Sequence, residues 1–484
     1  MPSLKKIFKG IIDAFDFEKT TRSDDNVVLK NDDSTSLPHD DGTSSRKKDD
    51  STLFAENNIG KKESVIQCIR KRSYEINEQD IPRFIEELKP FLISNKNGDY
   101  LNDYVCDDYF RFLDLRKHPD CRVVVIGDIH CDYKSLAAIL LKLTVSEYDY
   151  FEKAYFVFMG DYLDRGSALC EPLLLLMDLK QILGERLIML RGNHELISYN
   201  AEKEMIESRV LPQQSCPTLN EYCGNDKEFL HAFADFFRTL PTYVYLKTDK
   251  DNILLTHASV PRQIFFDTFY YDQNTGSIEY EHGFLYEQGK KAEESISDDS
   301  LKSKTEKMNN SLLTIRNKIL FDMIWGDPVH AKEKYQVSGR FEFGSDQYNA
   351  YAKKNNITKF FRSHVPLEYG YEAFFDNRLW SIFSSGGAAN EQAGYAGIEP
   401  AFAIIKDDGS YSIENSYIYR VRICRGVVVT CNIYSGELVD ENMNKYMLNK
   451  EFTCSGDVAM HIDNLFSDIN AGFATENDDN KSEE

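Results

Sequence analysis

Three short polar motifs decide how this chain folds: Gly127-Asp128-Ile129-His130, Gly160-Asp161-Tyr162-Leu163-Asp164-Arg165-Gly166 and Arg191-Gly192-Asn193-His194-Glu195. Each motif directly follows an apolar run typical of a buried strand: Val123–Ile126, Tyr155–Met159 and Leu187–Leu190. Helical patterns over Ser135–Leu143 and Leu169–Leu183 separate these runs. The alternation predicts a βαβαβ unit of mostly parallel strands, and therefore a fold of the α/β class.

Two further histidines stand at the ends of later predicted strands, His257 after 253–256 and His364 after 359–362. Open α/β sheets place their ligands beyond the carboxyl ends of the strands. Asp128 and Asp161 are 33 residues apart, and Asp161 and Asn193 are 32 apart. Each interval fits one strand–helix–strand crossover, so we expect these polar side chains to meet at one sheet edge.

The residue types at these strand ends suit a pair of metal ions. Aspartate, histidine and asparagine supply oxygen and nitrogen ligands, and no cysteine belongs to the set. One carboxylate can bridge two ions about 3.5–4 Å apart, a spacing used for in-line attack on phosphorus. A lone Gly-Asp turn or a lone histidine is more often structural. Five such motifs in order, each at a strand end, predict a dimetal site.

Together the motifs resemble the signature of the phosphoprotein phosphatase family of metallophosphoesterases. Trp325-Gly326-Asp327-Pro328 and Phe341-Glu342-Phe343-Gly344 resemble segments of its eukaryotic-type serine/threonine branch. The resemblance covers about 121–434, and this chain would be a divergent member. It implies an α/β (α+β) fold: a metallophosphoesterase-type β-sandwich flanked by helices, with the dimetal site at the C-terminal ends of the strands.

The resemblance also implies two divalent metal ions, for which we expect Mn²⁺, with Fe or Zn as alternatives. Six residues would hold them: Asp128 and His130 the first ion, Asp161 both ions, and Asn193, His257 and His364 the second. Two divalent ions lower the pKa of a bridging water, so that hydroxide exists near neutral pH.

The remaining site residues follow from the same resemblance. His194 would protonate the leaving alkoxide, with Asp164 orienting its imidazole. Arg165 would bind the phosphoryl oxygens together with Asn193. The family's second phosphate-binding arginine is absent from its usual place, and Arg340, three residues away, is the candidate substitute.

The implied function is hydrolysis of phosphoserine and phosphothreonine monoesters in proteins by direct attack of the hydroxide that bridges the two ions. A metal-dependent phosphotyrosine phosphatase is the alternative, because Ser384–Ala388 replaces the family's loop near the site and 273–312 is an insertion. No cysteine has an arginine six positions on, which excludes a cysteine-based phosphatase. The segment Trp325–Pro328 argues against a dinucleoside-polyphosphate hydrolase, and the complete ligand set against an inactive binding module.

The amino-acid composition limits which binding partners and which cellular compartment we expect. The 484 residues carry 79 acidic and 57 basic side chains, a net charge of −22, which argues against nucleic-acid partners and leaves phosphoproteins as the expected ones. Ten cysteines without a CxxC pair indicate a reducing, cytoplasmic compartment. No apolar run reaches the roughly 18 residues of a membrane span, so we expect a soluble protein.

We expect five regions along the chain: an amphipathic helix at 1–19, a disordered linker at 20–60, a helical region at 61–120, the catalytic domain at 121–440 with its insertion at 273–312, and a C-terminal helix and acidic disordered tail at 441–484. The apolar face of residues 4–15 either docks on the protein's own surface or contacts a membrane or a partner. The acidic end resembles the C-terminal signals of effectors injected by intracellular bacteria, although such a composition is also ordinary for a disordered end.

Overall fold

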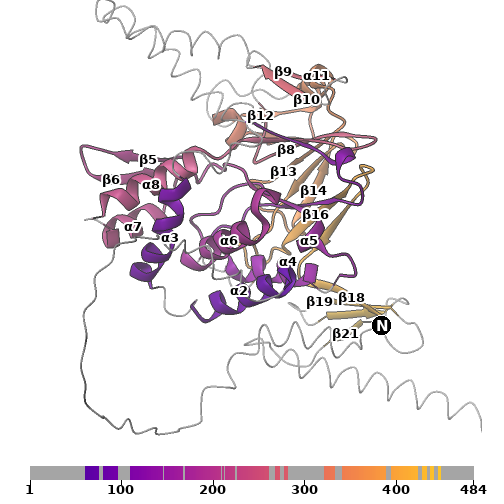
Figure 1. The fold of residues 1–484 in the computed structure, drawn as a ribbon. Helices are drawn as coiled ribbons and strands as arrows, with labels where there is room; N and C mark the ends of the chain where they lie inside the picture. Colours follow the sequence, from indigo (N-terminus) through magenta and orange to yellow (C-terminus); the bar gives the residue numbers. More distant parts are fainter. Residues whose placement is uncertain are drawn as a thin grey trace, which may run out of the picture.

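The computed structural model describes most of residues 60–447. The residues outside this description are 1–59, 76–79, 96–109, 145, 167–168, 209, 212, 224–225, 261–267, 273–276, 282–320, 333–340, 388–393, 423–427, 433–436, 441–444 and 448–484. Two large sheets and the helices around them make up the body of the molecule (Figure 1).

The first sheet contains the three strands that precede the polar motifs. β2 (Arg122–Ile126), β3 (Tyr155–Phe158) and β4 (Leu187–Met189) pair in parallel, connected through α4 (Tyr133–Thr144) and α6 (Cys170–Leu183). The predicted βαβαβ unit is therefore present. Beyond this unit, β16 (Ala401–Lys406) pairs antiparallel with β2, and β17 (Tyr411–Asn415) pairs antiparallel with β16, so the sheet is mixed.

The second sheet has the order β1-β7-β8-β13-β15-β14 and is also mixed. Its strands are β1 (Phe110–Asp114), β7 (Tyr243–Lys247), β8 (Asn252–Thr256), β13 (Lys359–Arg362), β15 (Leu379–Ile382) and β14 (Tyr371–Phe374). The prediction that 61–120 is helical is wrong for β1, which pairs in parallel with β7. So short a strand is stabilised by a distant partner that local sequence does not reveal.

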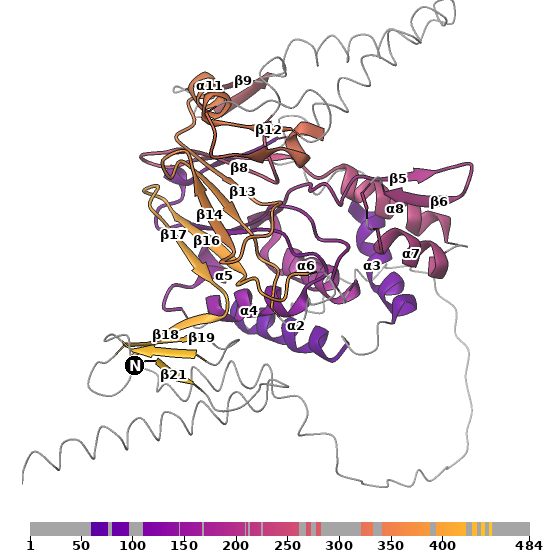
Figure 2. The same cartoon turned by 180° about the vertical axis from the view of Figure 1, so that it is seen from behind.

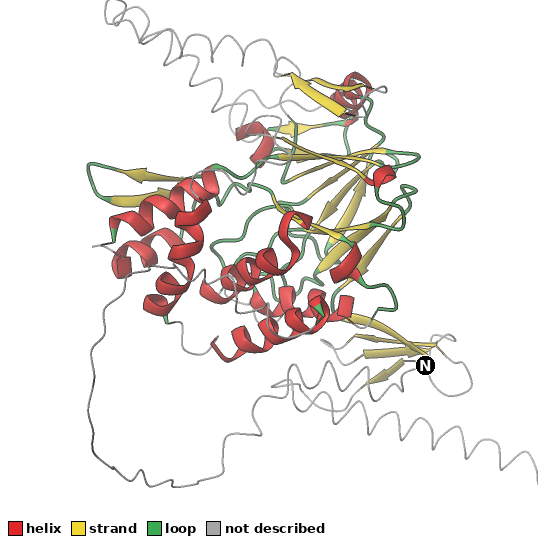
Figure 3. Ribbon diagram, in the orientation of Figure 1, coloured by secondary structure: helices red, strands yellow, loops and turns green. Residues whose placement is uncertain are grey.

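The two sheets pack face to face because side chains alternate along each strand. Val123 and Val125 contribute to the core between the sheets, which also contains Phe361 of β13. Val124 and Ile126 face the other way and belong to the core shared with the helices. Phe360 lies on the outer face of the second sheet, in the core that includes residues of α11 (Ser345–Asn355). The result is a layered α/β/β/α sandwich (Figure 3).

The helices on the outside of the first sheet form two groups, seen from both sides in Figures 1 and 2. α2 (Lys61–Glu75) packs on α6 and α4. α3 (Ile81–Asn95) packs on α8 (Lys227–Arg238), where the rings of Phe91 and Phe236 are 5.8 Å apart, and both helices contact α7 (Ser215–Cys223). α8 is strongly amphipathic, with Phe229, Phe233 and Phe237 fully buried.

Small elements complete the described chain. They are α5 (Tyr150–Lys153), two 3₁₀ turns at Leu115–Lys117 and Gly184–Arg186, the hairpins β5 (Ile197–Asn200)–β6 (Met205–Ser208) and β9 (Thr268–Asp272)–β10 (Ser277–Glu281), the pair β11 (Asp327–Pro328)–β12 (Glu342–Phe343), and a meander of β18 (Ile418–Arg422), β19 (Val428–Asn432), β20 (Glu437–Asp440) and β21 (Lys445–Met447).

Several of the predicted regions lie wholly or partly outside the described residues. The helix at 1–19 and nearly all of the linker at 20–60 lie outside the described residues. The insertion at 273–312 contains β10, and its remainder lies outside them. In the region 441–484 the described piece is the strand β21, and the predicted helix and tail fall outside. No helix in the described part of the chain is long and apolar enough to cross a membrane.

Candidate dimetal site

The polar motifs meet where strands of both sheets end. A bridge between Asp128 and Phe383 connects the two sheets at this edge. The turns are tight: the backbone φ is +46° at His130, +53° at Asp161 and +80° at His364. Non-glycine residues seldom adopt this left-handed conformation, and such strain concentrates at functional sites. Gly160 has φ +104°, and a side-chain carbon there would lie 2.5 Å from the backbone nitrogen of Gly192, so only glycine fits.

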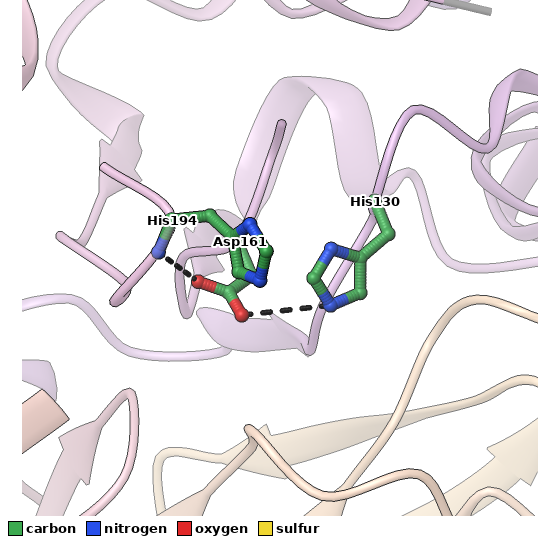
Figure 4. Close-up of side chains that lie close together, drawn as sticks. All are labelled: His130, Asp161 and His194. Carbon is green, nitrogen blue, oxygen red and sulfur yellow. Dashed lines mark hydrogen bonds and ion pairs between the residues drawn. The ribbon is translucent and has the colours of Figure 1, made fainter. Parts of the chain in front are cut away.

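The first group of candidate ligands consists of Asp128, His130 and Asp161, all buried. His130 Nε2 is 3.5 Å from Asp128 Oδ2. The same nitrogen is 3.5 Å from Asp161 Oδ2 (Figure 4). His130 Nδ1 donates to the carbonyl oxygen of Leu163 at 3.0 Å, so in the neutral ring Nε2 presents a lone pair. Asp128 Oδ2 accepts no hydrogen bond within the described residues. A nitrogen lone pair facing two carboxylates is a donor set that suits a cation.

The second group consists of Asp161 again with Asn193, His257 and His364. His257 Nε2 lies 3.4 Å from Asp161 Oδ1, 2.9 Å from Asn193 Oδ1 and 3.2 Å from His364 Nδ1. His257 Nδ1 donates to the carbonyl oxygen of Met159 at 2.8 Å, so in the neutral ring Nε2 again presents a lone pair. The oxygen of Asn193 faces only acceptor atoms, and either a rotated amide or a cation would satisfy them.

Asp161 therefore belongs to both groups through its two carboxylate oxygens. Candidate ligand atoms of Asp161, His257 and His364 all lie within 4.8 Å of one another, and so do those of His130, Asp161 and His194. Burial raises the pKa of Asp161 well above its usual range, and the charges of Asp128 and Glu195 raise it further. A carboxylate in such surroundings calls for positive charge. The residues present thus fit a pair of divalent cations.

His194 is held at the same place by two hydrogen bonds. Its backbone N–H donates to Asp161 Oδ1 at 2.9 Å (Figure 4), and its Nδ1 is 2.8 Å from Asp164 Oδ2. The other oxygen of Asp164 accepts the backbone N–H groups of Gln214 and Ser215, both at 2.8 Å. Burial would raise the pKa of Asp164, but its hydrogen bond with His194 is among the interactions that lower it. A charged Asp164 keeps the proton on His194 Nδ1.

Glu195 has a structural part in the site that the sequence did not reveal. The buried carboxylate accepts the N–H groups of Asp161 at 2.8 Å, Tyr162 at 2.9 Å and Gly192 at 3.0 Å. It thereby ties the second motif to the third. Burial raises its pKa to about 7. Its place at the end of the Gly-Asn-His-Glu motif was the available signal.

Ser363 and Arg362 were also missed, although they directly precede His364. Ser363 Oγ accepts the N–H of Asp128 at 2.8 Å and donates to Asp128 Oδ1, which fixes that carboxylate. The buried Arg362 donates to the carbonyls of Ala258 and Gly326, both at 2.9 Å. It joins the segment after β8 to the segment before β11.

A groove of about 550 Å³ opens over both groups. Its walls include His194, Arg165, Trp325, Phe374 and Tyr395. Tyr395 belongs to the segment that follows the replaced loop Ser384–Ala388. Arg340, the candidate second phosphate-binding arginine, lies outside the described residues.

The family model for calcineurin-like phosphoesterases matches residues 121–368, about half of the chain and all six candidate ligands. The chain belongs to this family. The predicted metallophosphoesterase fold is thereby confirmed, and so is the family to which the motifs pointed.

Curated relatives carry serine/threonine phosphatase names. An Encephalitozoon cuniculi protein named "Probable serine/threonine-protein phosphatase" is 24% identical over 296 residues, 60% of this chain and 50% of the relative. A Candida albicans "PP2A-like" serine/threonine-protein phosphatase is 24% identical over 269 residues, 54% of this chain and 51% of the relative. The rat serine/threonine-protein phosphatase with EF-hands 1 is 22% identical over 281 residues, which are 57% of this chain and 40% of the relative. The chain thus spans about half or less of these relatives.

Two solved structures align with part of this chain. One is a Saccharomyces cerevisiae serine/threonine phosphatase described as similar to human PP5, with a TM-score of 0.46 and 20% identity over 67% of this chain and 88% of that one. The other is a cold-active protein-tyrosine phosphatase of a Shewanella species, with a TM-score of 0.36 and 15% identity over 64% of this chain and 83% of that one.

Proposed function

We propose that this protein is a metal-dependent phosphoprotein phosphatase that hydrolyses phosphoserine and phosphothreonine monoesters. One observation carries the proposal: the two oxygens of Asp161 face two separate sets of buried lone pairs at the floor of an open groove. Family membership and the names of the relatives support the choice of reaction. Phosphoproteins are the corresponding partners.

In this proposal six side chains hold two divalent ions, with Asp161 shared between them. The full set is Asp128, His130, Asp161, Asn193, His257 and His364. Bound cations at these positions supply Lewis acidity toward phosphoryl oxygens. Mn²⁺ is our first choice of metal, because oxygen and nitrogen ligands of this kind suit it, and Fe and Zn are the alternatives.

Arg165 and Asn193 bind the phosphoryl group in this scheme. Arg165 lines the groove, and its buried Nε has no hydrogen-bond partner among the described residues, so it is free to take an anionic oxygen. A guanidinium also spreads its other N–H donors over neighbouring oxygens of the same group. Arg340 stays a proposed second contact.

His194 transfers the proton that the leaving oxygen needs. Asp164 holds the proton on Nδ1, which leaves Nε2 to carry the one that is given to the serine or threonine oxygen. Burial lowers the pKa of His194 to about 4. A bound phosphate dianion raises that pKa, because a nearby opposite charge favours the imidazolium, so substrate binding itself loads the acid.

Matched peptides test the proposal. The Mn²⁺-loaded protein should show a kcat/KM at least about tenfold higher on phosphoserine and phosphothreonine peptides than on the phosphotyrosine peptide, since discrimination is a difference in transition-state binding. A tenfold preference for phosphotyrosine would overturn the substrate class. Asp235→Asn is the control, because Asp235 is only half-buried, lies outside the strand-end motifs and pairs with Arg238 at the end of its own helix.

For residues 4–15 we propose docking on the protein's own surface, with contact to an anionic membrane surface or a partner as the alternative. If they bind a membrane, removing them should leave peptide turnover unchanged and abolish association with anionic liposomes. A full-length protein that ignores liposomes would favour docking on its own surface. A reducing, cytoplasmic location and delivery into a host cell stay proposals of the same kind.

A further inference from the structure

The groove over the candidate metal ligands continues into an arm along the outer face of the second sheet. Arg362 of β13, Ser381 of β15 and Glu372 of β14 are partners in one row across the three strands, and all three line the groove. Cross-strand partners point to the same face of a sheet. Neighbouring strands lie about 4.8 Å apart, so Glu372 is two strands, or roughly 10 Å, away from Arg362 and the end of β13 that carries His364.

Most of the side chains that line this arm are apolar. They come from the segment around β11 and from the segment that follows His364: Trp325, Pro328, Val329, Val365, Pro366 and Leu367. Val329, Val365 and Leu367 are partly buried and Pro366 is exposed, so the arm offers apolar surface to a molecule that enters it. The whole groove, at about 550 Å³, falls within the roughly 300–1,000 Å³ of ordinary ligand pockets. It therefore has room for more of a substrate than its phosphoryl group.

The two acidic side chains of this arm each have a partner. Asp327 Oδ1 accepts a hydrogen bond from Nη2 of the buried Arg362 at 2.9 Å. Glu372 Oε1 lies 2.9 Å from His330 Nε2, which donates to it, since a carboxylate oxygen accepts. Both carboxylates are thus engaged by the protein's own side chains, and neither is left to attract a basic side chain of a substrate.

His330 engages Glu372 and covers an aromatic ring at the same time. Its imidazole is stacked on the ring of Phe374, with centroids 4.4 Å apart and 16° between the planes. Glu372 and Phe374 are two residues apart on β14, so their side chains share a face and one imidazole reaches both. His330 itself remains 64% exposed, and an exposed pair of this kind contributes little to stability. Replacing it should therefore change the chemistry of the arm without unfolding the protein.

We propose that His330 is a specificity-determining residue: by engaging Glu372 and covering Phe374, it makes this arm accept an apolar side chain of the phosphopeptide in preference to a basic one. The proposal rests on the proposed phosphatase function and adds a sequence preference to it. A lysine ammonium in the arm would lose water against apolar walls and find Glu372 already engaged, whereas a leucine side chain would gain by leaving water. An extended chain advances about 3.3–3.6 Å per residue, so the selected side chain stands two or three positions from the phosphoserine.

Turnover of designed peptides by the full-length, Mn²⁺-loaded protein provides the test. Each phosphoserine peptide has alanine around the phosphoserine, except for one leucine or one lysine placed two or three positions away on either side. We expect kcat/KM to be at least about tenfold higher with leucine than with lysine at one of these positions, since discrimination is a difference in transition-state binding. His330→Ala should bring this ratio to about one, chiefly by raising the value for lysine, because the carboxylate of Glu372 then becomes available.

Two controls separate charge from shape. Glu372→Gln in the His330→Ala background should remove the gain for lysine, because the charge that attracts it has gone. His118→Ala removes another exposed histidine next to a tyrosine ring, 5.8 Å from that of Tyr155, which does not line the groove. It should leave the ratio unchanged. Turnover of nitrophenyl phosphate, which has no flanking residues, and elemental analysis normalise each sample for active, metal-loaded protein.

A wild type that hydrolyses the leucine and lysine peptides equally at every position, or that prefers lysine, would overturn the inference and leave the proposed function standing. A His330→Ala protein that keeps the wild-type ratio would do the same. If the wild type hydrolyses no phosphoserine peptide, the dissociation constants of the same peptides, measured by fluorescence anisotropy, decide instead. A preference for leucine that His330→Ala removes would keep the role of His330 without the reaction, and the lack of such a preference would overturn it.

Discussion

Two clusters of charged side chains in this protein, one around the buried Arg72 and one at the strand ends, are neutralised in opposite ways. Between α2, α3 and α6, Arg72 lies 2.8 Å from Asp178 and 2.6 Å from Glu87, so each negative charge touches a positive one. At the strand ends, Asp128 and Asp161 converge on an imidazole nitrogen of His130, and the described residues place no lysine or arginine in an ion pair with either carboxylate. The first cluster is balanced by the chain itself, and the second is not.

The pKa shifts of Glu87 and Asp161 express the same contrast, whereas Asp128 differs from Asp161: burial would raise its pKa, but His130, His257 and Ser363 lower it to about 2. For Glu87 the cost of burial is outweighed by Arg72, and its pKa falls. For Asp161 burial and the neighbouring acids act together, and its pKa rises. A balanced cluster stabilises the fold, whereas an unbalanced one costs stability until cations from outside bind. In this chain, the charges that are paired with opposite charges of the protein therefore serve structure, and those that are left unpaired serve chemistry.

Asp161→Asn should have the largest effect on activity. The amide keeps the shape and still accepts the N–H of His194, but it removes the charge shared by the two groups. We expect metal content and turnover to fall to background. The melting temperature of the metal-free variant should equal or exceed that of the metal-free wild type, because a buried charge has gone. A clear drop in melting temperature would mean that the carboxylate stabilises the fold, against the contrast drawn here.

His194→Asn comes next, and it separates proton transfer from metal binding. Turnover of a phosphoserine peptide should fall by about 10²–10⁴-fold, the usual contribution of a general acid. The loss should be smaller with a nitrophenyl ester, whose leaving group hardly needs a proton. Both ions should remain, as measured by elemental analysis. Equal losses on the two substrates would contradict the proposed role of His194.

Glu195→Gln should have an intermediate effect. The two carboxylate oxygens accept hydrogen bonds from three backbone N–H groups. The glutamine amide has one oxygen, and its NH₂ group would face a backbone N–H whose hydrogen bond it cannot accept. We expect the free energy of unfolding to fall by about 1–3 kcal/mol, the cost of unsatisfied buried groups. Because the loop of Asp161 shifts with it, kcat/KM should fall roughly tenfold as well, by the order of one hydrogen bond. Denaturant titration and peptide kinetics on the same sample check both expectations.

Arg72→Met should leave catalysis almost untouched while destabilising the protein. The substitution leaves Asp178 and Glu87 without a positively charged partner. Because both carboxylates are partly exposed, we expect the free energy of unfolding to fall by about 3 kcal/mol, at the low end for breaking a buried ion pair. Per folded molecule, kcat/KM should change less than about twofold. A change in kcat/KM larger than the change caused by Glu195→Gln would erase the distinction between the two clusters.

The strand-end motifs predicted the fold family and the meeting of the site residues because their signal is local. Each motif carries its own glycine and follows its own strand, and the crossover length determines where the next one returns. Local patterns failed for β1, whose strand state depends on pairing with β7. They also failed for the supporting residues. Glu195 and Ser363 act through backbone groups far away in sequence.

The central claim is that the unbalanced cluster is completed by divalent cations that make the protein a phosphatase. Its most direct measurement is turnover of a phosphoserine peptide before chelation, after exhaustive chelation and after Mn²⁺ is returned, with elemental analysis of each sample. We expect about two ions per chain in the active samples, no turnover in the chelated one and recovery on addition of Mn²⁺. Turnover that persists in protein shown to hold no divalent metal would contradict it.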